Sequence, residues 1–368
     1  MSKSYYSLGL MSGTSADGID ASIIQSNGDN ECEVILDKYF KYTQNIYENI
    51  HNLKDKINDS KDLRNLSEKI QSLEKEITLF HADVVNEIIK NFESNIDFLG
   101  FHGQTIFHNA KEKISKQLGD GRLLSKRTRK SVIYNFRQND LDNGGHGAPL
   151  TPIFHKLLKK KFKIKDATFV NIGGITNITT VCHDDSMSGT DIGPGMCLID
   201  RWIRKKTKKN YDENGAIAKS GKVNKLGLNQ LLKNFYEKEN SLNTSPIQSF
   251  DTKYFDFSFI KNLSLEDGAA TLTEFTAKII ISSIKKTERY KEKIILCGGG
   301  RKNNFLVEKL KEEIDRIKLI DEYKVDGDFI ESQAFAYLAI RSYLKLPISF
   351  PETTGVAKSC TGGIFVKN

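Results

Sequence analysis

The sequence predicts an α/β protein of two domains, and three observations support this expectation. The chain has 368 residues, which is more than one hydrophobic core usually serves. Short apolar runs of strand length alternate with longer stretches of helical spacing. A strand–glycine turn–strand unit occurs twice, at residues 9–20 and at residues 171–179. We therefore expect two similar α/β blocks, each opened by such a unit.

The first block contains the longest helical region. Apolar residues recur there at spacings of three and four, over residues 45–92. The predicted strands of this block cover residues 5–11, 20–26, 33–40, 97–101 and 131–136.

The second block repeats the pattern with shorter strands. Its predicted strands cover residues 168–171, 178–181 and 293–296, and its predicted helices follow Pro194 and cover residues 270–285, 304–317 and 330–344. The expected N-terminal domain covers residues 1–130, with residues 345–368 returning to it, and the expected C-terminal domain covers residues 131–344.

Composition excludes several classes of protein. No run of 18 apolar residues is present, and the first ten residues are too short and polar for a signal peptide. The five cysteines form no CxxC pair, which disfavours disulfide frameworks and zinc sites. We expect a cytoplasmic protein with reduced thiols and no membrane partner.

The net charge of +8 favours anionic ligands. Lysines cluster at residues 159–161 and 205–209, and a nucleic-acid surface is one interpretation. Solvated helix ends explain such clusters more simply, and the aromatic residues typical of RNA-binding surfaces are not interleaved with them. We expect no nucleic-acid partner.

The segment at residues 9–20 (GLMSGTSADGID) is the most informative one. Its glycines allow the backbone to approach an anion, and Ser12, Thr14 and Ser15 add hydroxyl donors. Asp17 and Asp20 suit a phosphate site only if a divalent cation or a proton transfer is involved. The segment indicates a phosphate-binding hairpin, and an ordinary Gly/Ser turn is the alternative.

Two further glycine turns also follow strands, namely Gly173-Gly174 and Gly298-Gly299-Gly300. No GxxxxGK[ST], strand-linked GxGxxG, GxSxG or protein-kinase signature is present. Three separate glycine turns suit a nucleotide bound between two domains, with two loops on the phosphates and one on adenosine. Each turn alone is a weak signal, and the three together are stronger.

Asp191 lies in the segment GTDIGPG, which we expect at a strand–helix junction. A carboxylate near a helix N-terminus stays ionised and can accept a proton. The alternative interpretation is a helix cap, because Pro194 suits the first turn of a helix.

These motifs together resemble the anhydro-N-acetylmuramic acid kinase family, of the sugar kinase, actin and Hsp70 superfamily. The resemblance runs from Leu8 to about Leu344. The motifs that carry it are GLMSGTSADGID, FHGQTIFH, NFRQNDLDNGGHGAPLTP, NIGGITNIT, GTDIGPGMCLID, ATLTEFTA and CGGGRKN, in family order. It implies a two-domain actin-like ATPase (ribonuclease H-like) fold with an interdomain cleft.

The resemblance also implies roles for individual residues. ATP phosphates would be bound by Gly13, Thr14, Ser15, Ala16, Asp17, Gly18, Ile19 and Asp20 together with Gly173 and Gly174, with Asp17 and Asp20 close to Mg²⁺. Gly298, Gly299 and Gly300 would bind adenosine, and Asp191 would be the catalytic carboxylate. The sugar pocket would be lined by His102, Gln104, Arg137 and Glu331.

The implied reaction converts ATP, 1,6-anhydro-N-acetylmuramic acid and water to ADP and N-acetylmuramic acid 6-phosphate. The implied assembly is a homodimer. Three residues depart from the family pattern: Met196 stands where Asn is usual, His146 replaces Gln, and Asn135 replaces Asp. These departures keep open an alternative sugar or anhydro-sugar substrate such as levoglucosan. An ATP-switched binding module without acceptor chemistry is a further alternative.

Overall fold

The computed structural model describes residues 3–242, 250, 254–286 and 293–368. The chain divides into two compact units, each with its own sheet. Unit 1 comprises Met1–Lys163 and Phe329–Asn368, and unit 2 comprises Ile164–Asp328.

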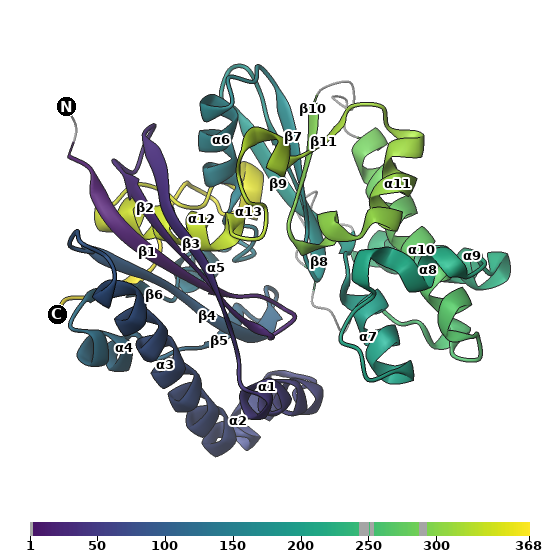
Figure 1. Cartoon of the computed structure of the whole chain (residues 1–368), viewed down its shortest axis with the longest axis horizontal. Helices are drawn as coiled ribbons and strands as arrows, with labels where there is room; N and C mark the ends of the chain where they lie inside the picture. Colours follow the sequence, from purple (N-terminus) through teal and green to yellow (C-terminus); the bar gives the residue numbers. More distant parts are fainter. Residues whose placement is uncertain (1–2, 243–249, 251–253, 287–292) are drawn as a thin grey trace. The chain divides into compact units, whose positions relative to one another are not determined.

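Unit 1 is built on a mixed sheet (Figure 1). Its strand order is β12-β6-β4-β1-β2-β3. The strand β2 pairs with β1 and with β3 in antiparallel fashion, whereas β4 pairs with β1, and β6 with β4, in parallel. The strand β5 also pairs with β4 but is not part of this strand order. The bounds are β1 (Tyr5–Ser12), β2 (Gly18–Ser26), β3 (Cys32–Lys41), β4 (Phe98–Asn109), β5 (Ile114–Leu118), β6 (Ser131–Tyr134) and β12 (Ile364–Val366).

Successive side chains of each strand point to opposite faces of this sheet, and both faces carry apolar residues. Helices therefore pack on both faces. Leu8 and Leu10 of β1 share a core with the apolar faces of α1 and α3. Between them, Gly9 faces α12, and a Cβ there would lie 1.9 Å from the Ser332 carbonyl oxygen. Gly9 therefore lets α12 contact the sheet backbone. The helices are α1 (Gln44–Lys56), α2 (Ser60–Asn65), α3 (Ser67–Lys90), α4 (Gly121–Thr128), α5 (Gln138–Asp142), α6 (Pro152–Lys161), α12 (Ile330–Tyr343) and α13 (Pro351–Thr354).

Unit 2 repeats this topology with the strand order β11-β10-β7-β8-β9. Its first three strands are antiparallel, and β10 and β11 add to β7 in parallel. The bounds are β7 (Ala167–Ile172), β8 (Ile175–Val181), β9 (Met187–Pro194), β10 (Lys293–Cys297) and β11 (Ile317–Leu319). The repeated order confirms the expected pair of α/β blocks and the actin-like fold class.

The helices of unit 2 form two cores. One core joins α10 and α11 to the sheet through Ile172, Ile280 and Leu306. The other surrounds the fully buried Trp202 of α7 and includes residues of α9 and α10. The bounds are α7 (Cys197–Lys206), α8 (Ala216–Ser220), α9 (Lys225–Leu242), α10 (Leu265–Lys286) and α11 (Asn304–Glu313).

The unit boundaries differ from those expected from the sequence. Residues 131–163 and 329–344 were expected in the C-terminal domain, but they belong to unit 1. The reason is pairing and packing, because β6 pairs with β4 and α12 packs against β1 and β4. In the part of the chain that the structure describes, no helix has the length and apolar character needed to cross a bilayer.

Two predicted elements have different ends in the structure. The strand expected over residues 97–101 continues to Asn109, because β5 supplies a hairpin partner. The helix expected over residues 304–317 ends at Glu313, and Ile317 begins β11.

Candidate active site

The loop between β1 and β2 is held by hydrogen bonds to Gln104 of β4. The side chain of Ser12 lies 2.6 Å from Gln104 Oε1 and 3.0 Å from the Gly18 carbonyl oxygen. Gln104 Nε2 donates to the Gly13 carbonyl oxygen at 3.0 Å. Gln104 is fully buried, so its amide supports this loop and has no exposed surface for a ligand in this structure.

The tip of the same loop presents polar groups to solvent. Thr14, Ser15 and Asp17 are exposed, and Ser15 Oγ donates to Asp17 Oδ1 at 2.5 Å. A Cβ at Gly13 would meet no heavy atom closer than 3.8 Å, so the backbone is accessible there. Lys54 of α1 donates to the Thr14 carbonyl oxygen at 3.2 Å, which brings a cation to the loop. Lys54 was not predicted, because only the fold brings α1 to the loop.

The buried His102 pairs with the half-buried Arg137 in unit 1. Arg137 Nε and Nη2 lie 3.2 and 3.0 Å from His102 Nε2, and His102 Nδ1 lies 2.8 Å from the Gly103 carbonyl oxygen. Burial, together with the Arg137 charge, holds the pKa of His102 well below its ordinary value. The imidazole is therefore neutral, with Nδ1 donating and Nε2 accepting.

Arg137 also fastens the glycine-rich segment at residues 143–149. Its Nη1 donates to the Gly147 carbonyl oxygen at 2.7 Å, and the Gly147 amide donates to Asp140 Oδ2 at 2.6 Å. The backbone amide of His146 donates to the Thr354 carbonyl oxygen at 2.7 Å. Burial lowers the pKa of the His146 imidazole below its ordinary value, so His146 is neutral near pH 7.

Glu331 lies in the first turn of α12. Phe335 follows Glu331 by four residues and so shares its side of the helix. The Phe335 ring packs on the His102 ring with centroids 4.5 Å apart. Unit 1 thus brings His102 and Arg137 into contact, and the Phe335 ring connects His102 to the side of α12 that carries Glu331.

In unit 2, the Gly173-Gly174 turn is locked to the segment that precedes α7. The amide of Met196 donates to the Gly173 carbonyl oxygen at 2.8 Å, and the amide of Gly195 donates to the Gly174 carbonyl oxygen at 3.0 Å. A Cβ at Gly195 would lie 2.2 Å from the Gly173 carbonyl oxygen, which requires glycine there. The Met196 side chain packs against both apolar cores of the unit.

Asp191 lies within β9, opposite Asn177 of β8. It is 8% exposed, and its Oδ2 accepts a hydrogen bond from the Phe250 amide at 3.0 Å. The expected strand–helix junction and the helix-cap alternative are both wrong. The strand continues to Pro194, and the N-cap of α7 is Met196.

The Gly298 turn follows β10 and packs beside the Gly173-Gly174 turn. A Cβ at Gly300 would lie 2.3 Å from Ile172 Cγ2, next to Gly173 in the chain, whereas a Cβ at Gly299 would meet nothing within 4 Å. Gly298 has φ +78°, which favours glycine. One side of this turn is therefore packed, and Gly299 is open to a ligand.

The family model for anhydro-N-acetylmuramic acid kinase matches residues 5–367. The chain belongs to the anhydro-N-acetylmuramic acid kinase family. A protein of that name from Pelagibacter ubique is 56% identical over 378 aligned positions, which cover 100% of both chains. Proteins of that name from Rhizobium etli and Zymomonas mobilis are 36% and 35% identical, with 97% of this chain covered in each case.

Family membership confirms the resemblance drawn from the motifs. It makes the chain an ATP-using kinase that phosphorylates a sugar hydroxyl. Among the described residues, no group of three or more His, Cys, Asp or Glu side chains could hold a metal ion by itself.

Proposed function

We propose that the protein uses ATP and water to convert 1,6-anhydro-N-acetylmuramic acid into N-acetylmuramic acid 6-phosphate, in the recycling of cell-wall peptidoglycan. The observation that carries this proposal is the family match over residues 5–367, with 56% identity to a full-length relative of that name. An ATP-switched binding module is not favoured, because the relatives are named as kinases.

In this proposal, residues 13–20 and the Gly173-Gly174 turn bind the ATP phosphates, and Gly298–Gly300 binds adenosine. Three features support these roles: the exposed hydroxyls of Thr14 and Ser15, the accessible backbone at Gly13, and the open position at Gly299. Backbone amides and hydroxyls in such loops suit phosphate oxygens, and a flat glycine surface suits a planar base.

Asp17 and Asp20 fit a role beside Mg²⁺. Asp17 is exposed and Asp20 is half-buried, in the same hairpin. Mg²⁺ in kinases is commonly held by one or two carboxylates plus substrate phosphates, which agrees with this small donor set. When bound, the ion would neutralise charge on the transferring phosphate.

We assign the general base to Asp191. Its carboxylate takes a proton from a water molecule as the water oxygen bonds to the anomeric carbon of the sugar, and the bond from that carbon to O6 breaks. The released O6 then attacks the γ-phosphorus, and the bond to the β-phosphate oxygen breaks to leave ADP. Burial and the hydrogen bond from the Phe250 amide suit this role, because both hold the carboxylate in one position.

His102, Arg137 and Glu331 are proposed to hold the sugar, and Gln104 to act with them by supporting the Gly13 loop. The guanidinium of Arg137 matches the planar lactyl carboxylate of a muramic sugar. We also propose a cytoplasmic homodimer. Light scattering coupled to gel filtration would measure the assembly.

The test is phosphate transfer from ATP to three separate acceptors: 1,6-anhydro-N-acetylmuramic acid, N-acetylmuramic acid and levoglucosan. We expect a phosphorylated product from the first acceptor, with one oxygen from ¹⁸O-labelled water at its anomeric carbon. Transfer to levoglucosan alone would instead support the anhydro-sugar alternative. ATP binding without transfer to any acceptor would support the binding module.

A further inference from the structure

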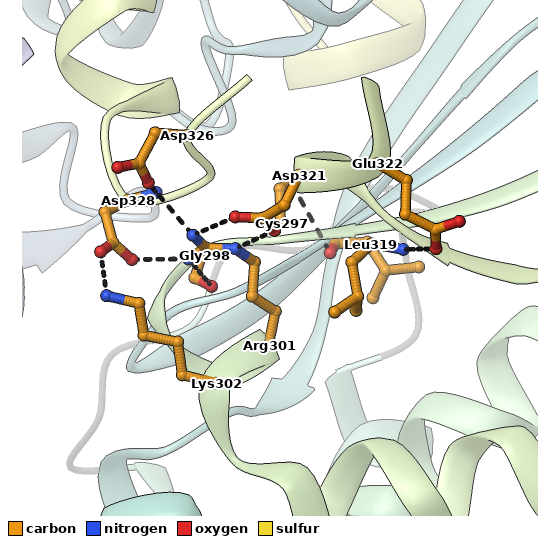
Figure 2. Close-up of polar contacts among 10 residues, drawn as sticks. Cys297, Gly298, Arg301, Lys302, Leu319, Asp321, Glu322, Asp326 and Asp328 are labelled. Atoms are coloured by element: carbon orange, nitrogen blue, oxygen red, sulfur yellow. Dashed lines mark hydrogen bonds and ion pairs between the residues drawn. The ribbon is translucent and has the colours of Figure 1, made fainter. Parts of the chain in front are cut away.

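Arg301 is a buried cation surrounded by carboxylates, next to the Gly298 turn (Figure 2). Its Nε and Nη2 lie 2.7 and 2.8 Å from the two oxygens of Asp321. Its Nη2 also lies 3.1 Å from Asp326 Oδ1, and its Nη1 lies 2.5 Å from Asp328 Oδ1. The Arg301 side chain is only 3% exposed, whereas the three carboxylates lie at the rim of the cluster.

The cluster needs the planar fork of an arginine. Asp321 is bound by two nitrogens at once, and this bidentate contact holds the pKa of the Asp321 carboxyl below its ordinary value. A lysine ammonium in the same place would keep the charge but could not reproduce the fixed geometry. The cluster therefore defines the orientation of Arg301 as well as neutralising it.

The same guanidinium reaches the Gly298 turn. Arg301 Nη1 donates to the Gly298 carbonyl oxygen at 3.2 Å, and the Arg301 backbone amide donates to the same oxygen at 3.2 Å. The Gly298 amide in turn donates to the Gly327 carbonyl oxygen at 3.3 Å. The segment at residues 321–328 and the turn are thus tied together through Arg301.

Gly299, which is open on one side, immediately follows the peptide that Arg301 holds. The orientation of the Gly298 carbonyl determines where the Gly299 amide and Cα lie, because the peptide unit is planar. Arg301 lies on the packed side of the turn, where it is too buried to contact a ligand directly.

We infer that Arg301 is a positioning residue for nucleotide binding: through its carboxylate cluster it holds the Gly298–Gly300 turn in the shape that accepts adenosine. This inference rests on the proposed function, because it takes the turn to be the adenosine-binding element. It adds a residue and a supporting segment, residues 321–328, that do not touch the nucleotide.

The test compares the full-length wild type with Arg301→Lys, and uses Lys302→Gln as the matched control. Lys302 is the next residue and pairs with the same Asp328, but its side chain is 62% exposed. For Arg301→Lys we expect ADP binding, measured by calorimetry, to weaken by about tenfold or more, the effect of losing a charge-assisted hydrogen bond. The KM for ATP should rise by a similar factor, while kcat and the KM for the sugar stay within about twofold. Lys302→Gln should match the wild type.

A second variant, Asp326→Asn, removes one half-exposed carboxylate and leaves Arg301 bound to the other two. It should fold and weaken ADP binding by about two- to fivefold, in line with a partly exposed charge pair. A folded Arg301→Lys that binds ADP as the wild type does would overturn the inference. The inference would also be overturned if kcat and both KM values became worse by the same factor, or if both variants failed to fold. In either case the cluster would serve stability alone.

The two proposals fail in different ways. A wild type that binds ADP but phosphorylates no sugar contradicts the proposed function, and the ADP affinities of the variants still test Arg301. A wild type that does not bind ADP overturns both.

Discussion

Arg137 Nε and Nη2 lie 3.2 and 3.0 Å from one nitrogen of His102, Nε2. These are the two nitrogens that would bind a carboxylate. That edge of the guanidinium is the one suited to bidentate contact with a planar anion. His102 therefore occupies the place that a lactyl carboxylate would take on this edge. For Arg137 to bind a carboxylate through it, the contact with His102 must be exchanged for one with the ligand.

Arg137→Lys should raise the KM for 1,6-anhydro-N-acetylmuramic acid by about tenfold or more, because lysine cannot make the bidentate contact. The KM for ATP should change little. Levoglucosan lacks the lactyl group, so any activity toward it should be the same in the variant and the wild type. An equal loss of activity toward both sugars would show that Arg137 only holds the glycine-rich segment through Gly147 and does not recognise the carboxylate.

Asp191→Asn should lower kcat by about 10²–10⁴-fold, because an amide cannot accept the proton from water. The amide oxygen can still accept the hydrogen bond from the Phe250 amide, so ADP affinity should be unchanged. Steady-state kinetics and calorimetry on the same preparation measure both quantities. Ser188→Ala, at an exposed position of the same strand, is the control and should retain full activity. Full turnover by Asp191→Asn would remove Asp191 from the mechanism.

Substitutions at two adjacent glycines should separate ligand contact from packing. Gly300→Ala places a Cβ 2.3 Å from Ile172 Cγ2 and should destabilise the protein by about 1–3 kcal/mol. Gly299→Ala meets nothing within 4 Å, so its stability should stay within about 0.5 kcal/mol of the wild type while ADP binding weakens. Thermal melts with and without ADP measure both effects. Normal ADP binding by Gly299→Ala would show that this face of the turn does not contact the nucleotide.

Stability should fall as the pH drops below about 6.5, since buried histidines are neutral in the folded chain. Burial lowers the pKa values of His81 and His108 to about 4 and that of His155 to about 3. The unfolded chain takes up these protons first, so the stabilisation is complete above pH 6.5 and is lost as the pH falls toward the folded values. Between pH 6.5 and its folded pKa, each histidine contributes about 1.4 kcal/mol per pH unit to the change in the free energy of unfolding.

Urea denaturation at pH 6.5, 5.5 and 4.5 measures this slope. His81 packs against Phe101 with ring centroids 4.8 Å apart, so His81→Phe should keep the core and reduce the slope by about one proton. His183→Asn, at an exposed position, is the control. An unchanged slope in His81→Phe would mean that His81 does not contribute to the pH dependence.

Much of the fold could be predicted from the sequence because its signals are local. Strands such as β1 and β2 carry apolar runs, and α3 carries its apolar residues at helical spacing. The three glycine turns were recognisable because glycine marks positions where the backbone approaches another group closely, as at Gly298 and Gly300. These local patterns, with the motifs, were sufficient to identify the family and the two-block architecture.

Only the tertiary structure decided which distant segments come together. β4 continues past His102 because β1 and then β5 pair with it, and residues 131–163 join unit 1 because β6 adds to its sheet. Asp191 lies inside a strand, since β9 continues to pair with β8 as far as Pro194, with one register shift just after Asp191. The carboxylates around Arg301 come from residues 20 to 27 positions away. Such contacts depend on strand pairing and side-chain packing between separate segments, which no local spacing encodes.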